Sequence, residues 1–249
     1  MKIKACYISH PGLKRTCNQD NLYYQGRTLP QEHSKARNFR VSKWDSGELL
    51  SFGVFDGMGG EQYGELASFI AATSAQSILK AEKRRQIPSD LLYEICKNAN
   101  EEIWKKTMEL QAQRIGTTMA FVMLQYNTIW CCNVGDSRIY RLRDGELTQM
   151  SMDHVAVNPE HPERKPALSM HLGMGPMEIF PNPYMINETI KSQDLYLICS
   201  DGITDMIGLS EIRQIIGGSN IRKCVTNLLK EVLNGGGLDN ATMILIKVT

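Results

Sequence analysis

The chain has 249 residues, and 42% of them are hydrophobic, which is enough to bury the core of one large domain or two small ones. Its formal net charge of +1 gives neither a basic face for nucleic acid nor an acidic tail. Seven cysteines without a regular spacing or a Cys-x-x-Cys pair predict free thiols in a reducing, cytoplasmic compartment. The apolar stretch at the N-terminus is short and is broken by His10 and Pro11, so we expect no signal peptide. No run of roughly 18 apolar residues occurs, so we expect no segment that spans a membrane.

Hydrophobic periodicity and turn residues predict a chain of short strands interrupted by two pairs of helices. We expect strands over 2–9, 20–25 and 49–55, helices over 61–80 and from 88 to about 104, strands over 117–124, 128–134, 137–143, 146–150 and 195–199, helices over 210–216 and 219–233, and a last strand over 241–248.

Three further features complete this outline. Residues 26–47 are polar and predict a long loop or a hairpin, and a proline-rich segment at about 155–192 predicts a short surface flap. Asp144-Gly145 is a strong signal for a two-residue hairpin. Because hairpin signals dominate and no linker interrupts the chain, we expect mainly antiparallel sheets with helices outside, in one domain over 1–249.

Aspartates gather at the ends of the predicted strands. Asp56, Asp136 and Asp201 follow apolar strands, Asp239 precedes the last strand, and Asp20 begins the second strand. One such aspartate alone is usually a turn residue. If the strand ends converge, however, each pair of charges about 4 Å apart repels by on the order of 1–4 kcal/mol, so the cluster needs protons or cations. Oxygen ligands favour Mg²⁺ or Mn²⁺, whereas the His and Cys spacing of a zinc site is missing.

Paired divalent ions suit one chemistry in particular, the hydrolysis of a phosphate ester. They lower the pKa of a shared water and neutralise charge on the phosphate. Gly57, Gly59 and Gly60 would let the backbone turn tightly beside a metal, so that a backbone carbonyl serves as a ligand; alternatively, these glycines form an ordinary turn before a helix.

Seven short motifs, in order along nearly the whole chain, resemble the type 2C family of metal-dependent Ser/Thr protein phosphatases, in the form of its bacterial branch. They are Arg15-x-x-Asn18-Gln19-Asp20, Asp56-Gly57-Met58-Gly59-Gly60, Gly116-Thr117-Thr118, Gly135-Asp136-Ser137-Arg138, Asp153-His154, Ser200-Asp201-Gly202-x-x-Asp205 and Asp239-Asn240. The resemblance implies an α+β fold, a four-layer αββα sandwich of two mainly antiparallel sheets packed face to face with helices outside.

The resemblance also implies a role for each matching residue. Two ions, Mg²⁺ or Mn²⁺, and a possible third would be held by these residues: Asp56 as the bridging ligand, the Gly57 carbonyl, Asp201 and Asp239 as the other direct ligands, Asp20 through a metal-bound water, and Asp136 and Asp205, with Asp201, at the weaker third site. Arg15 matches the residue that grips the substrate phosphate, a task for which a planar guanidinium with two parallel donors is suited. Asp56 and Arg15 are therefore the expected catalytic residues.

Three departures from the family pattern concern the outer shell, the proton donor and the flap. Gln19 stands where many members carry Glu, which removes one negative charge. Met58 stands where eukaryotic members carry a His thought to protonate the leaving group, and a thioether cannot do this. The short flap matches only loosely. We expect His154 to brace the flap, and we consider His161 and His171 as acids or substrate contacts.

The sequence thus predicts metal-dependent hydrolysis of phosphoserine and phosphothreonine in proteins, with products of a Ser/Thr kinase as substrates and no nucleic-acid or membrane partner. A scaffold without activity and a phosphatase of a small phosphorylated metabolite remain alternatives. A third alternative is a cysteine-dependent phosphatase, since Cys132 to Arg138 satisfies the pattern Cys-x5-Arg. Asp136 would then place a carboxylate inside the anion-binding loop, which argues against this chemistry.

Overall fold

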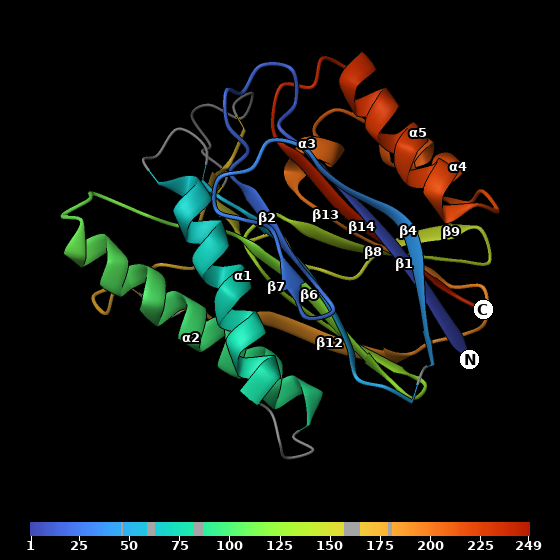
Figure 1. The fold of residues 1–249 in the computed structure, drawn as a ribbon, viewed down its shortest axis with the longest axis horizontal. Coiled ribbons are helices and arrows are strands. Elements are labelled where there is room, and N and C mark those ends of the chain that lie inside the picture. Colours follow the sequence, from blue (N-terminus) through green and yellow to red (C-terminus); the bar gives the residue numbers. More distant parts are fainter. Residues whose placement is uncertain (46, 59–62, 82–86, 157–164, 179–180) are drawn as a thin grey trace.

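Two six-stranded sheets pack face to face in the computed structural model, which describes all residues except 46, 59–62, 82–86, 157–164 and 179–180 (Figure 1). The first sheet has the order β4 (Ala36–Asp45), β1 (Lys2–His10), β14 (Ala241–Val248), β13 (Leu195–Cys199), β8 (Arg138–Arg143) and β9 (Glu146–Gln149). The second sheet has the order β12 (Tyr184–Thr189), β7 (Thr128–Val134), β6 (Met119–Gln125), β5 (Leu50–Asp56), β2 (Asp20–Tyr24) and β3 (Arg27–Thr28). Neighbouring strands in both sheets are antiparallel, which confirms the predicted sheet type.

Helices cover the outer face of each sheet, which confirms the predicted αββα sandwich (Figure 1). The second sheet is covered by α1 (Gly64–Ala81) and α2 (Pro88–Glu109), and the first by α4 (Leu209–Ile216) and α5 (Ile221–Asn234). A single turn, α3 (Asp201–Thr204), follows β13. Among the described helices, none is long and apolar enough to cross a membrane.

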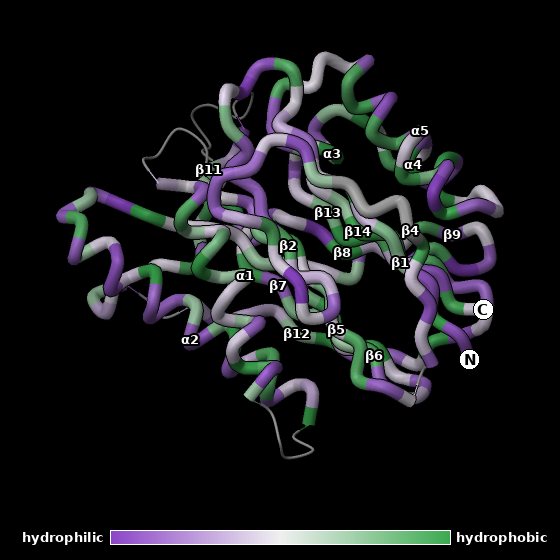
Figure 2. Tube along the Cα trace, in the orientation of Figure 1, coloured by the Kyte–Doolittle hydropathy of each residue, from purple (hydrophilic) through white to green (hydrophobic). Residues whose placement is uncertain are grey.

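The core has three layers, one between the sheets and one beneath each helix pair. β13 shows how one strand serves two of them. Leu195, Leu197 and Cys199 pack against the helices of the first sheet, whereas Tyr196 and Ile198 face the other sheet. Successive side chains of a strand point to opposite faces, so a strand covered on both sides is apolar throughout. Figure 2 accordingly shows hydrophobic residues along β13 and β14, while the helices alternate between hydrophobic and hydrophilic residues.

Two of the strands that the sequence did not predict, β4 and β12, lie at sheet edges. β4 falls within the predicted loop or hairpin over 26–47, and among the described strands it pairs with β1 alone. β12 falls within the predicted flap, pairs only with β7, and alternates between half-buried and exposed side chains. An edge strand needs little apolar surface, so neither segment has the hydrophobic run that identified the inner strands.

The ends of α4 and α5 also differ from the prediction. Ser210 and Ser219 are plausible N-caps by residue type, but α4 begins after Gly208, which makes no side-chain cap. The cap of α5 is Asn220, whose side chain accepts hydrogen bonds from the backbone of Arg222 and Lys223. The two N-cap positions thus lie one or two residues away from these serines.

Antiparallel pairing brings the ends of distant strands to one edge of the sandwich. Asp20, the first residue of β2, lies opposite Asp56, the last residue of β5. In the first sheet, the end of β13 lies beside the start of β14, with Cys199 opposite Met243. The predicted acidic residues of both sheets therefore collect at the same edge.

Candidate metal centre

The two sheets are joined at this edge by a hydrogen bond to a buried acid. Ser200, directly after β13, donates through Oγ to Oδ2 of Asp20 on β2 at 2.8 Å. The other carboxylate oxygen of Asp20, Oδ1, is buried without a hydrogen-bond partner. A buried polar atom without a partner costs free energy, and an acceptor oxygen in this position is suited to a ligand that donates a proton or carries positive charge.

The protonation of Asp20 reflects its surroundings. Its pKa is raised to about 7. Burial is the largest cause, the charges of Asp201 and Asp239 act in the same direction, and hydrogen bonds from Thr242 and Ser200 act in the opposite direction. Carboxylates from the first sheet therefore act directly on a carboxylate of the second.

Asp56 and Asp136 are affected in the same direction. Burial, followed by the charges of Asp201 and Asp20, raises the pKa of Asp56 well above its ordinary value. Burial and Asp201 raise the pKa of Asp136 to about 6. This group of acids has less positive charge around it than its ionised form requires, which is the electrostatic character of a site for cations.

The turn after Asp56 is held by hydrogen bonds to two other segments of the chain. The Asp56 carbonyl accepts hydrogen bonds from Thr118 N at 2.9 Å and Thr117 Oγ1 at 2.8 Å, and Gly57 N donates to the carbonyl of Gln19 at 3.1 Å. A Cβ at Gly57 would collide with the carbonyl oxygens of Gly64 and Gln19, so only glycine fits. The predicted turn glycines Gly59 and Gly60 lie outside the described residues.

Asn240 fixes the loop that carries Arg15 and leads to Asp20. Its Oδ1 accepts from Gln19 N at 2.8 Å, and its Nδ2 donates to the carbonyls of Pro11 and Cys17, both at 2.9 Å. A Cβ at Gly202 would collide with the Asn240 carbonyl, so the glycine allows α3 to approach the start of β14. Asn240 and Gly202 belong to two of the sequence motifs, but their contacts join segments far apart in the sequence and have no local signal.

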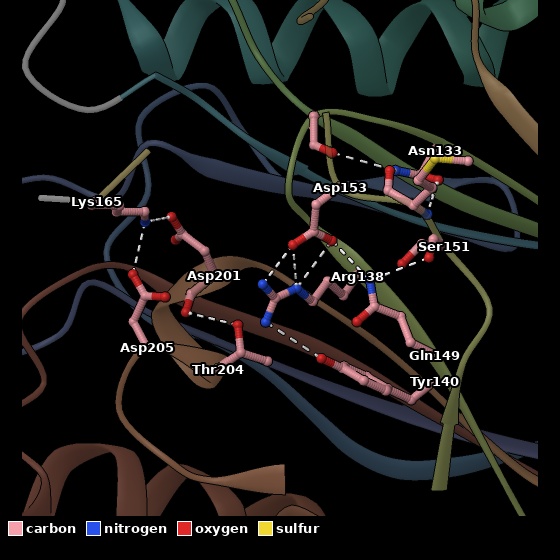
Figure 3. A network of polar contacts seen from close by, with 12 residues as sticks. Asn133, Arg138, Tyr140, Gln149, Ser151, Asp153, Lys165, Asp201, Thr204 and Asp205 are labelled. Atoms are coloured by element: carbon pink, nitrogen blue, oxygen red, sulfur yellow. Dashed lines mark hydrogen bonds and ion pairs between the residues drawn. The ribbon is translucent and has the colours of Figure 1, made fainter. Parts of the chain in front are cut away.

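Two cationic side chains already contact the acids. Arg15 donates through a terminal guanidinium nitrogen to Asp239 Oδ2 at 2.7 Å, and this hydrogen bond is the main cause of its raised pKa. Lys165 donates through Nζ to Oδ2 of Asp201 and, at 2.7 Å, to Oδ2 of Asp205 (Figure 3). The sequence singled out Arg15 but not Lys165, which lies between two prolines in a segment without periodicity.

The donors fit divalent cations of the Mg²⁺ or Mn²⁺ type. Every candidate side-chain ligand is a carboxylate, and Asp20 offers a buried oxygen without a partner. In the part of the chain that the structure describes, no three His, Cys, Asp or Glu side chains stand together as a finished ligand set. The acids are thus close enough to shift one another's pKa, while Arg15 and Lys165 hold oxygens of Asp239, Asp201 and Asp205 that a cation would use.

The cysteine-dependent alternative does not fit the structure. Cys132 is fully buried in the layer beneath α1 and α2, and burial raises its pKa well above the ordinary value, so no thiolate is available. Arg138 donates to both carboxylate oxygens of Asp153. His154 receives a hydrogen bond from Gly135 N at 3.1 Å and braces that turn.

His171 lies beside Met58. A Cβ at Gly116 would touch both the Met58 sulfur and the His171 ring, and His171 is buried. The histidine considered in the flap is thus close to the position where a proton donor was missing, whereas His161 lies outside the described residues.

Comparison with known proteins identifies the class to which this fold and acidic edge belong. The family described as Protein phosphatase 2C matches residues 37–213. The protein phosphatase PhpP of Streptococcus pneumoniae is 30% identical over 97% of this chain and 96% of its own length. The chain belongs to the protein phosphatase 2C family.

The serine/threonine protein phosphatase PstP of Mycobacterium tuberculosis is 26% identical over 96% of this chain. The match spans only 44% of that relative's length. A crystal structure of the PstP catalytic domain in complex with 2 manganese ions superposes with a TM-score of 0.76, at 26% identity, and covers all of both chains.

Proposed function

We propose that this chain hydrolyses phosphoserine and phosphothreonine in proteins with the help of two Mg²⁺ or Mn²⁺ ions, and that a third ion binds more weakly. The observation that carries the proposal is the acidic cluster at one edge of the sandwich, to which both sheets contribute, with Arg15 beside it. The relatives support it, since PstP and PhpP are named protein phosphatases and PstP binds 2 manganese ions.

The proposal gives each acid the role that the family resemblance implies. In this proposal Asp56 lies between two ions, which are also held by the Gly57 carbonyl, Asp201 and Asp239, while Asp20 acts through water and Asp136 and Asp205 contribute to the third site. Such ions lower the pKa of a bound water and offset the charge of a phosphate.

Arg15 binds the substrate phosphate in this proposal. Its side chain is 38% exposed and points to Asp239, so it can reach both solvent and the acidic cluster. A guanidinium donates two parallel hydrogen bonds to phosphate oxygens and thereby orients the ester. Asp20 stays in place through Ser200, and the turn at Asp56 through Thr117 and Thr118, so the acids are oriented before substrate arrives.

The wider setting is part of the same proposal. We take residues 1–249 as one phosphatase domain with a flap at about 155–192, phosphorylated products of a Ser/Thr kinase as substrates, and the cytoplasm as the location. All seven cysteines are free, which supports a reducing compartment.

A phosphopeptide panel with and without EDTA tests the proposal on the wild type and on Asp201→Asn. We expect Mn²⁺-dependent release of phosphate, and a loss of at least about a hundredfold in Asp201→Asn because a metal ligand is neutralised. Asp144→Asn is the matched control, because Asp144 lies in the β8–β9 turn at φ 50°, a conformation that Asn also adopts.

Each alternative has its own outcome in this experiment. Full activity of Asp201→Asn would contradict the proposed centre. Cleavage of small phosphate esters without cleavage of phosphopeptides would favour a metabolite phosphatase. A wild type that binds no Mn²⁺ in calorimetry and releases no phosphate would favour the scaffold.

A further inference from the structure

Lys165 forms a charged contact between the flap and the candidate metal centre. It lies two residues before β11 (Ala167–Leu168), which pairs with β10 (Val155–Ala156) in a two-stranded ribbon. Its Nζ donates to Asp201 Oδ2 and to Asp205 Oδ2, the latter at 2.7 Å (Figure 3). One ammonium therefore bridges two carboxylates of the proposed centre.

The helical turn α3 places the two carboxylates that Lys165 contacts on one side of the backbone. Asp201 and Asp205 are four residues apart, and the backbone N–H of Asp205 donates to the Asp201 carbonyl at 2.8 Å. Residues at this spacing lie on the same face of a helical turn. Their carboxylates can therefore hold one cation between them, whether it is an ammonium or a metal ion.

The charge of Lys165 is stabilised at this place. Burial lowers its pKa, but the charges and hydrogen bonds of Asp201 and Asp205 outweigh burial and raise it. Lys165 also lowers the pKa of Asp136, the remaining acid of the proposed third site. The ammonium thus interacts with all three of these acids.

We propose that Lys165 is a built-in competitor for the metal ion at Asp201 and Asp205. An ammonium and a divalent ion cannot both occupy the same carboxylate oxygens, so a metal ion that binds there displaces Lys165 and releases its contact between the flap and α3. The proposal rests on the metal-dependent function above and adds a regulation of the same site. Because coupling is reciprocal, whatever removes Lys165 strengthens metal binding, and metal binding frees Lys165.

The first test is titration of the metal-free protein with Mn²⁺ in a calorimeter. Lys165→Met keeps most of the side-chain volume and removes the charge. We expect it to bind the weakest Mn²⁺ about tenfold more tightly than the wild type, because a positive charge a few ångströms away is gone. Lys165→Arg keeps the charge and is expected to bind as the wild type does.

The matched control is Lys2→Met. Lys2 also pairs with an aspartate, Asp45, at 2.6 Å, but at the far end of β1 from the acidic edge. Its loss is expected to leave Mn²⁺ binding unchanged. Circular dichroism of each variant checks that the fold is kept.

The second test needs no variant. An acylating reagent modifies free amines, and mass spectrometry reports the extent of modification at each lysine. We expect Mn²⁺ to raise the modification rate of Lys165 several-fold and to leave the rate of Lys2 unchanged. The Mn²⁺ concentration at half of this increase should equal the dissociation constant of the weakest site in calorimetry.

The outcomes separate the two proposals. A wild type that binds no Mn²⁺ would overturn both. Normal Mn²⁺ binding with an unchanged weakest site in Lys165→Met, or with a modification rate of Lys165 that ignores Mn²⁺, would overturn the competitor role alone and leave the proposed function standing.

Discussion

Buried acids occur in two regions of this molecule, and their surroundings differ in sign. Near the start of β13, Asp194 accepts hydrogen bonds from Arg143 Nε at 2.8 Å and from a terminal nitrogen of the same guanidinium at 2.6 Å. Burial, the largest single effect, raises the pKa of Asp194, but the hydrogen bonds and charge of Arg143, together with hydrogen bonds from the Lys191 backbone and Tyr196, lower the pKa below its ordinary value. At the other end of β13, the pKa of Asp20 and Asp56 is raised.

The two regions differ in the source of the positive charge, which is the protein itself in one region and the solution in the other. At Asp194 the chain brings its own arginine, and the ion pair is complete once the protein has folded. At the acidic edge the chain brings more carboxylates than cations, so the balance is left to ions from solution. The comparison separates acids that stabilise the fold from acids that serve a function at a cost in stability.

The largest expected effect is on activity at the acidic edge. Asp56→Asn removes the proposed bridging carboxylate and should lower kcat for a phosphopeptide about a thousandfold, as should an excess of EDTA on the wild type. Steady-state kinetics with Mn²⁺ measures it. Asp194→Asn is the same substitution near the other end of β13, and the folded variant is expected to keep its activity. Equal losses of activity in the two variants would contradict the division into acids that stabilise the fold and acids that serve the activity.

The next effect is on stability at Asp194. Asp194→Asn removes the nearer of the two carboxylates that pair with the half-buried Arg143, since Glu188 lies at 3.4 Å, and should lower the free energy of unfolding by about 2 kcal/mol. Because folding lowers the pKa of Asp194, its contribution is present above the ordinary pKa of 3.8 and is lost as the pH falls below it. Urea unfolding at pH 7 and pH 3 measures this: the difference between wild type and variant should shrink at the lower pH.

A smaller effect is expected for the phosphate-binding arginine. Arg15→Ala should lower kcat/KM about thirtyfold, mainly through a higher KM if Arg15 binds the ground-state phosphate. Initial rates over a range of phosphopeptide concentrations separate the two constants. Arg222→Ala, on the outer helix α5, is the control, and a fall in kcat at unchanged KM would assign Arg15 to the transition state instead.

The smallest effect runs opposite to the one at Asp194. Because folding raises the pKa of Asp56, the metal-free folded protein holds this proton to a higher pH than the unfolded chain does. This difference opposes folding at pH 7, so Asp56→Asn should raise the free energy of unfolding in EDTA by about 1 kcal/mol. Urea unfolding in EDTA measures it, and a destabilised variant would mean that Asp56 has a structural partner.

The sequence predicted features that depend on neighbouring residues. The β8–β9 hairpin follows from Asp144-Gly145, which have φ angles of 50° and 80°, as a two-residue turn requires. The inner strands follow from apolar runs such as Leu195–Cys199. The edge strands β4 and β12 were missed because half of an edge strand's surface faces water and carries no such signal.

For the site, the sequence supplied the acids and Arg15 but not the contacts that orient them. Ser200 meets Asp20 across 180 residues, and Lys165 meets Asp201 across 36. Nothing in the local pattern around Lys165 indicates where its side chain points. Such pairings follow from the packing of the two sheets, which only the assembled fold determines.

The pairing of Asp20 with Asp56 across β2 and β5 makes metal binding depend on the correct strand register. A slip of one residue between these strands would turn Asp20 to the opposite face of the sheet, and a parting of the sheets would separate Ser200 from Asp20. Only correctly aligned chains would then bind ions tightly, and bound ions would add stability that grows with their concentration. At high metal concentration, bound ions would therefore stabilise the native strand register relative to registers shifted by one residue.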